Sequence, residues 1–148
     1  MSDDILDSHH RSLARLRTFL AGEFAAMAIY HRLADRFPDE AHIHACLHAH
    51  QLRHRALEKL VHQQGGRIAA ADAAAAHPFT LCDDVALEGC VDAVLACLAE
   101  CEAAFAEDYR TFLPELDTEA REVVRSDILI AQRQTVHGLN MRLRHSLR

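Results

Sequence analysis

The stretch "GGRIAAADAAAAHPFTLCDD", residues 65–84, separates two halves of a chain that is otherwise rich in helix-forming residues. Gly65 and Gly66 are typical of a helix C-terminus, and Pro78 lies within the alanine-rich remainder. The segment is long enough to travel the length of a helical bundle. We therefore expect the helices before and after it to run in the same direction. The competing interpretation is a simple up-and-down bundle with a floppy loop.

Four long helices are predicted around this connection. Apolar residues recur at spacings of three and four along the first and third helices, and Pro38 and Pro114 end these two helices. The turns that follow them are short, so each should form an antiparallel hairpin with the next helix. The expected ranges are residues 5–36, 39–64, 83–113 and about 117–146.

Composition and charge narrow the class of protein. The chain has 148 residues, of which 50% are hydrophobic and only 5% aromatic, which favours one all-α domain over residues 1–148. The formal net charge of −6 argues against a nucleic-acid partner. No apolar run is long enough to span a membrane, and the acidic start does not resemble a signal peptide. We expect a soluble, cytoplasmic protein.

Five cysteines are present, and the odd number without a leader argues against a disulfide framework. Cys97 and Cys101 are four residues apart on the third predicted helix, where they could bind a metal or oxidise. Small buried residues are the commoner role of reduced cysteine. We therefore expect all five thiols to be reduced, without a bridge between Cys97 and Cys101.

Two acidic residues lie on apolar helix faces, Glu23 in the first helix and Glu102 in the third. Each is followed seven residues later by a tyrosine, Tyr30 and Tyr109 respectively. A carboxylate at a core position is costly unless it is paired, protonated or bound to a metal. This repeated pattern predicts a polar site inside the bundle.

The second and fourth helices carry a matching repeat, Gln51-x-x-His54 and Gln134-x-x-His137. In an antiparallel hairpin, residues equidistant from the turn lie at the same height. By this measure Glu23 lies level with Gln51, and Glu102 lies level with Gln134. The two halves of the chain should therefore bring their polar side chains together near the middle of the bundle.

The second helix is unusually rich in histidine, with four in the stretch "HACLHAHQLRH" at residues 44–54. His50 and His54 fall on the apolar stripe of this helix and are expected to be buried. His42, His44 and His48 are expected to face outward and to be dispensable for the fold and for any tight metal site.

The segments "GEFAAMAIY" (22–30), "RALEKLVHQQGG" (55–66) and "CEAAFAEDYRTFLPELDTEAREVV" (101–124) resemble an uncharacterised bacterial family of ferritin-like four-helix-bundle proteins. The resemblance covers most of the chain and implies two antiparallel hairpins joined by a long crossover between the second and third helices. Ferritin-like di-iron proteins hold their metals with one Glu from each of two helices and Glu-x-x-His from each of the other two. This chain differs, because Gln51 and Gln134 stand where the pattern has glutamate.

The resemblance implies one or two metal ions, with iron as the first candidate, held by a set of six residues: Glu23, Gln51, His54, Glu102, Gln134 and His137. Two neutral amides leave a di-iron centre short of negative charge, which disfavours oxygen activation. Three possibilities stay open: a single Fe or Zn ion, a two-metal site supplemented by His50 or Asp127, and a metal-free core of Glu–His, Glu–Gln and Tyr hydrogen bonds. Asp127 is included because it is expected to point to the core side of the fourth helix. The alternative function is a metal-free interaction or structural protein. Enzymatic activity and assembly into a homo-oligomer are left open.

Overall fold

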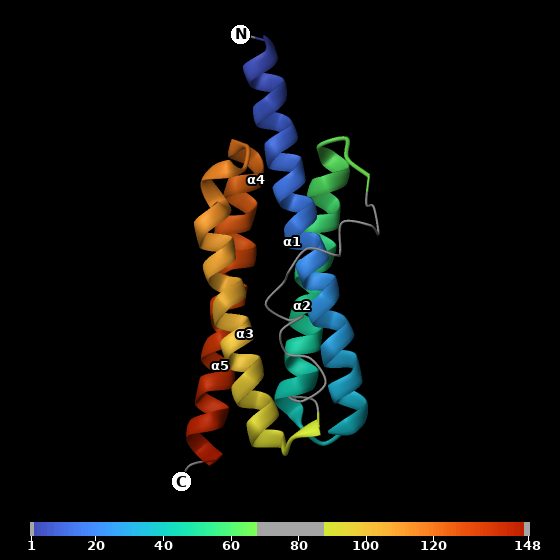
Figure 1. The fold of residues 1–148 in the computed structure, drawn as a ribbon, viewed down its shortest axis with the longest axis vertical. Coiled ribbons are helices and arrows are strands. Elements are labelled where there is room, and N and C mark those ends of the chain that lie inside the picture. The colour runs from blue at the N-terminus through green and yellow to red at the C-terminus, as the bar shows by residue number, and fades with distance from the viewer. Residues whose placement is uncertain (1, 68–87, 147–148) are drawn as a thin grey trace.

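The computed structural model describes residues 2–67 and 88–146, and this part of the chain is all-α, with no strand (Figure 1). The prediction of a helical bundle is therefore confirmed. The helical segments are α1 (Ser2–Arg36), α2 (Ala41–Gln63), α3 (Val91–Phe112), the 3₁₀ turn η4 (Leu113–Glu115), α4 (Thr118–Val123), the π-helical turn η5 (Val124–Leu129) and α5 (Ile130–Ser146). None of the described helices is long and apolar enough to cross a membrane.

The helices pair as two antiparallel hairpins (Figure 1). The first consists of α1 and α2, and the second of α3 with the continuous run from α4 to α5. Helix α2 ends at one end of the bundle and α3 begins at the other, so these two helices run in the same direction, as predicted. The predicted crossover at 65–84 lies mostly outside the described residues.

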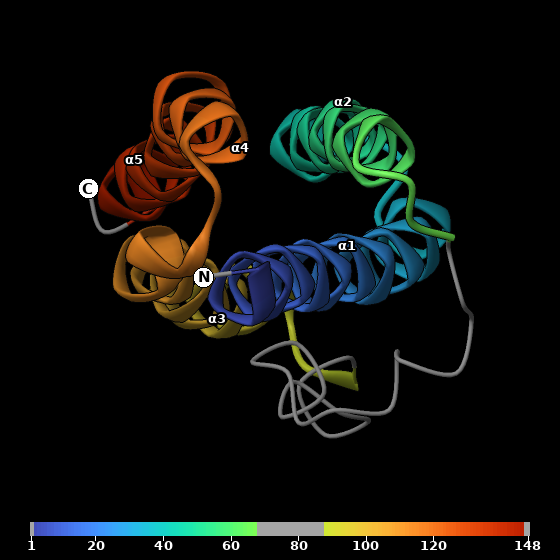
Figure 2. The same cartoon turned by 90° about the horizontal axis from the view of Figure 1, so that it is seen from above.

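Viewed along the bundle axis, α1 lies beside α2 and α3, and α5 lies beside α3 (Figure 2). Helices α2 and α5 face each other along the fourth side. Each of the four long helical segments therefore presents one face to a common interior. The site described below lies there.

Helix α3 begins eight residues later than predicted, at Val91 instead of Asp83. Cys90 has an extended backbone (φ −67°, ψ 163°), and Glu88 to Cys90 are not α-helical. Gly89 disfavours helix at this point because glycine loses the most backbone freedom on ordering. Residues 83–87 lie outside the described part of the chain.

The last long helix is interrupted by the π turn η5, which the sequence did not predict. A π turn holds one residue more than an α turn, so it rotates every following residue around the axis. The inward positions run through Ala120, Val124, Ile128 and Gln132 in steps of four. Asp127 is exposed, and the prediction that it points to the core is wrong.

The cysteines differ from the prediction in one respect. Cys101 is disulfide-bonded, so the expectation that all five thiols are reduced is wrong. Cys46, Cys90 and Cys97 are not part of a disulfide, which confirms that Cys97 and Cys101 are not joined to each other. Helical spacing alone gave no information about the bridge.

Candidate functional site

Two carboxylates lie fully buried in the middle of the bundle, Glu23 on α1 and Glu102 on α3. Each accepts a hydrogen bond from the tyrosine of the other helix. Tyr30 donates to Glu102 Oε1 over 2.7 Å, and Tyr109 donates to Glu23 Oε1 over 2.6 Å. Burial and the neighbouring carboxylates raise the pKa of both phenols well above the ordinary value, so the hydroxyls stay protonated and donate.

His50 of α2 lies between the two carboxylates and is also fully buried. Its Nδ1 is 2.5 Å from Glu23 Oε2, and its Nε2 is 2.5 Å from Glu102 Oε1. Burial lowers the pKa of His50, but the charges and hydrogen bonds of the two glutamates outweigh it and raise the pKa to about 9. At neutral pH the ring is therefore an imidazolium that donates from both nitrogens. The Tyr30 ring stacks on it, with the ring centroids 5.2 Å apart.

Arg53, three residues after His50, supplies a second buried cation and is only 3% exposed. Its Nε donates to Glu23 Oε1 over 3.1 Å and its Nη1 donates to Thr135 Oγ1 over 3.2 Å, while Nη2 lies 3.0 Å from His50 Nδ1. Burial raises the pKa of Glu23, but His50 and Arg53 outweigh it, so that pKa is lowered overall. With both glutamates ionised, two negative and two positive groups give the cluster a formal charge of zero.

Helix α5 completes the cluster with Gln132 and Thr135. The Gln132 amide donates through Nε2 to Glu102 Oε2 and to the Glu102 carbonyl oxygen, the latter over 3.0 Å. Its own Oε1 is buried without a partner. Each long helical segment of the bundle thus contributes to one hydrogen-bonded core cluster, which we define as Glu23, Tyr30, His50, Arg53, Glu102, Tyr109, Gln132 and Thr135.

The structure brings together only part of the predicted metal set. Glu23 and Glu102 meet as expected, but the other four residues do not join them. The His54 side chain is 20% exposed, and its Nδ1 lies 3.7 Å from Glu58 Oε2. Gln51 is half-buried, and Gln134 and His137 are exposed.

Both helices depart from the phase that the sequence suggested. On α2 the inward pair is His50-x-x-Arg53, one residue before Gln51-x-x-His54. On α5 the inward pair is Gln132-x-x-Thr135, because the π turn has rotated the helix. The sequence pattern predicts His50 on the apolar stripe, but it does not single out Arg53, Gln132 or Thr135. Spacings of three and four from Ile43 allow Arg53 as well as His54, so periodicity held a signal for Arg53 without deciding between them.

The outward histidines lie as predicted at two positions. His44 and His48 are exposed, and His44 Nε2 is 2.9 Å from the Pro38 carbonyl oxygen. His42 is half-exposed, with its Nδ1 3.4 Å from Glu40 Oε1.

The core cluster does not fit a di-metal centre. The i, i+3 spacing of the di-iron pattern is present on α2 and α5, but its residues are His-x-x-Arg and Gln-x-x-Thr instead of Glu-x-x-His. Both nitrogens of His50 face carboxylates, and the Arg53 guanidinium has only N–H donors and no lone pair for a metal. Among the described residues, no three His, Cys, Asp or Glu side chains are placed to hold one ion.

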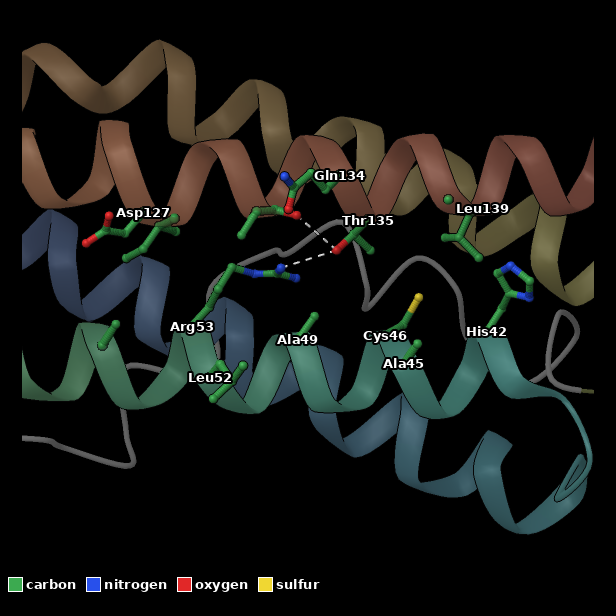
Figure 3. Close-up of a pocket in the computed structure, with 14 residues that line it drawn as sticks. His42, Ala45, Cys46, Ala49, Leu52, Arg53, Asp127, Gln134, Thr135 and Leu139 are labelled. Atoms are coloured by element: carbon green, nitrogen blue, oxygen red, sulfur yellow. Dashed lines mark hydrogen bonds between the residues drawn. The ribbon is translucent and has the colours of Figure 1, made fainter.

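An open cleft of about 510 Å³ lies beside the core cluster, between α2 and α5 (Figure 3). Arg53 and Thr135 form its polar floor, and Arg53 reaches across from α2 towards α5. His42 lies at one end and Asp127 at the other. The remaining lining is mostly small or apolar and includes Ala45, Ala49, Leu52, Ala56, Ala131, Gly138 and Leu139.

Cys46 also lines this cleft and is buried. Burial and the Glu102 charge raise the pKa of its thiol to about 12. A thiolate is the reactive form of cysteine, so Cys46 is a packing group here and not a nucleophile.

The arrangement therefore offers a rigid, neutral polar cluster and, next to it, an apolar cleft with one cation in its floor. No family model, curated protein or solved structure matches this chain.

Proposed function

We propose that the protein binds a small organic molecule in the cleft between α2 and α5, with Arg53 as the polar anchor. The observation that carries this proposal is a buried cation with unused donors. A guanidinium has five N–H bonds, and the contacts to Glu23, Thr135 and His50 engage at most three. At least two donors are therefore left for a molecule in the cleft.

The size and lining of the cleft support this function. Small-molecule sites typically occupy about 300–1,000 Å³ and combine mostly apolar walls with a few polar groups. The cleft measures about 510 Å³, and alanine, leucine and glycine provide most of its walls. Such sites also occur between the helices of bundles.

The core cluster holds the anchor in place. Arg53 is bonded to Glu23, and Glu23 is held in turn by His50 and Tyr109. A side chain fixed before binding loses little conformational entropy when the ligand arrives. These hydrogen bonds are of the kind predicted for a metal-free core, in which glutamates bond to histidine, glutamine and tyrosine. The histidine is His50 and the glutamine is Gln132, instead of the predicted histidines and glutamines.

Binding of an uncharged apolar dye, N-phenyl-1-naphthylamine, tests the function. We expect saturable binding of one dye per chain, with an increase in fluorescence. Replacement Gly138→Leu should weaken it about tenfold or more, because Gly138 lines the cleft and an added Cβ meets open space there. The leucine would therefore fill the cleft without disturbing the helix.

Ala103→Leu on the exposed face of α3 is the matched control and should bind the dye as the wild type does. The proposal is overturned if the wild type shows no saturable binding, or if Gly138→Leu leaves the affinity unchanged.

A further inference from the structure

The hydrogen-bonding groups in the cleft floor restrict what can bind there. Both oxygens of Glu23 already accept bonds, from Tyr109, Arg53 and His50. Both oxygens of Glu102 also accept bonds. The Oε1 atom accepts from Tyr30 and His50, and the Oε2 atom accepts from Gln132. The floor therefore offers the N–H donors of Arg53 and no carboxylate oxygen without a hydrogen bond, so a hydrogen-bond acceptor is the polar group that fits it best.

The charge of the floor is already balanced. Two carboxylates face one imidazolium and one guanidinium, and all four side chains are buried. A carboxylate ligand would add an uncompensated negative charge next to this cluster, where a low dielectric makes charge costly. A cationic head group at Arg53 would be repelled by the guanidinium, and the carboxylate that lines the cleft, Asp127, lies at the end opposite His42. An uncharged acceptor leaves the balance unchanged.

The shape of the cleft is elongated on one side of Arg53. Between Ala49 and His42, helix α2 contributes only Ala45 and Cys46 to the lining, and Leu139 of α5 lies across from this part (Figure 3). Gly138 of α5 also lines the cleft. The seven residue steps from His42 to Ala49 correspond to about 10 Å of cleft length. An extended apolar chain fits along this part.

We infer that the cleft takes an uncharged, elongated molecule whose carbonyl oxygen accepts hydrogen bonds from Arg53 while its apolar chain lies over Ala49 towards His42. An amide, ester or ketone meets this description. This inference rests on the proposed binding function of the cleft. It goes further by specifying the head group of the ligand, which apolar contacts alone do not determine.

Competition against the naphthylamine dye at pH 7 with octanamide, octanoate and octylammonium tests the head group at constant chain length. We expect octanamide to displace the dye several-fold more tightly than octanoate, and at least tenfold more tightly than octylammonium. In ¹⁵N-labelled protein, octanamide should shift the backbone amides of Ala49 and Gly138 and leave that of Ala103 unchanged.

The outcomes separate the two proposals. If octanoate binds most tightly, if the three compounds bind equally, or if octanamide fails to displace a bound dye, the inference about the ligand is overturned and the cleft remains a binding site. If the dye itself does not bind, the proposed function fails and the ligand class fails with it. Shifts confined to residues outside the cleft would also overturn the inference.

Discussion

His50 shows how strongly a single residue depends on its surroundings. A buried imidazole between two carboxylates is stabilised as the cation, although burial alone would favour the neutral ring. Arg53 is stabilised in the same way, by the carboxylate of Glu23. Breaking a buried ion pair by removing one partner is costly, because the remaining charge is left uncompensated.

Arg53→Met should therefore destabilise the protein by about 3–5 kcal/mol. Urea unfolding followed by circular dichroism measures the change. Arg110→Met is the matched control, because Arg110 pairs with Glu107 at the surface, where both side chains are more than half exposed, and a pair of this kind contributes at most about 1 kcal/mol. Equal losses for the two variants would contradict a special role for the buried pair.

The raised pKa of His50 also predicts how stability depends on pH. The folded value of about 9 lies above the unfolded value of 6.5, so the folded state holds an extra proton between these two limits. The contribution is complete below pH 6.5 and is lost as the pH rises through 9. The free energy of unfolding should fall by up to about 1.4 kcal/mol per pH unit in this window.

Denaturation series at pH 6, 7, 8 and 9 measure this slope. His50 faces Glu23 and Glu102, with Arg53 and Tyr30 beside it. His50→Gln removes the titrating group and should flatten the profile. A variant with an unchanged slope would show that another group titrates in this range.

At the scale of elements, the π turn η5 decides which side chains of α5 reach the core. With regular α-helical spacing from Ala120, Asp127 and Gln134 would face inward, as the sequence pattern predicts. One additional residue in the turn moves Ile128 and Thr135 into those two places and also turns Gln132 inward. Gln132 therefore reaches Glu102 because the π turn rotates the part of the helix that follows it.

Deleting Ser126, an exposed residue of the π turn, should convert the turn to α-helix and leave the later residues in their inward positions. We expect the free energy of unfolding to change by no more than about 1–2 kcal/mol. Deleting Ala103 from the regular helix α3 should abolish folding, because a missing residue rotates Tyr109 by about 100° relative to Glu102. Circular dichroism and thermal melting compare the two. Similar behaviour would mean that η5 does not hold an extra residue.

At the scale of the whole molecule, the two hairpins contribute similar core residues from their first helices, α1 and α3. They contribute different core residues from their second helices, α2 and α5. The Glu/Tyr pairs repeat, and each tyrosine bonds the other pair's glutamate. The pairs at i, i+3 do not repeat, because α2 supplies two cations and α5 an amide and a hydroxyl. Two positive side chains on α2 thus neutralise the two glutamates, a role that metal ions have in the di-iron pattern.

We predict that replacing all four of these residues, by His50→Glu, Arg53→His, Gln132→Glu and Thr135→His, creates a site for two Fe(II) ions. The ions should raise the melting temperature, since a ligand that binds only the native state stabilises it. The wild type should show no such shift with Fe(II) or Zn(II), because its donors do not converge.

Gln51→Glu with Gln134→Glu is the control, because it restores Glu-x-x-His in the sequence but on half-buried and exposed positions. It should not bind iron in the core. Stoichiometric Fe(II) binding by this control or by the wild type, measured anaerobically, would contradict our placement of the site.

The amino-acid sequence by itself determined the helical class, the two hairpins and the inward positions of Glu23, Glu102 and their tyrosines. Long apolar periods interrupted by proline specify helices and turns locally, and a carboxylate in the middle of such a period has no other face to occupy. The same pattern could not choose between Arg53 and His54, because spacings of three and four are both compatible with one broad helix face.

Only the tertiary structure decided the composition of the site. The rotation of α5 depends on the π turn, which has no apolar signature of its own, and the partners of His50 come from two other helices. The cleft exists because small residues of α2 face small residues of α5 across a side of the bundle that they do not fill. Such a space is a property of two packed helices together, and neither helix sequence specifies it alone.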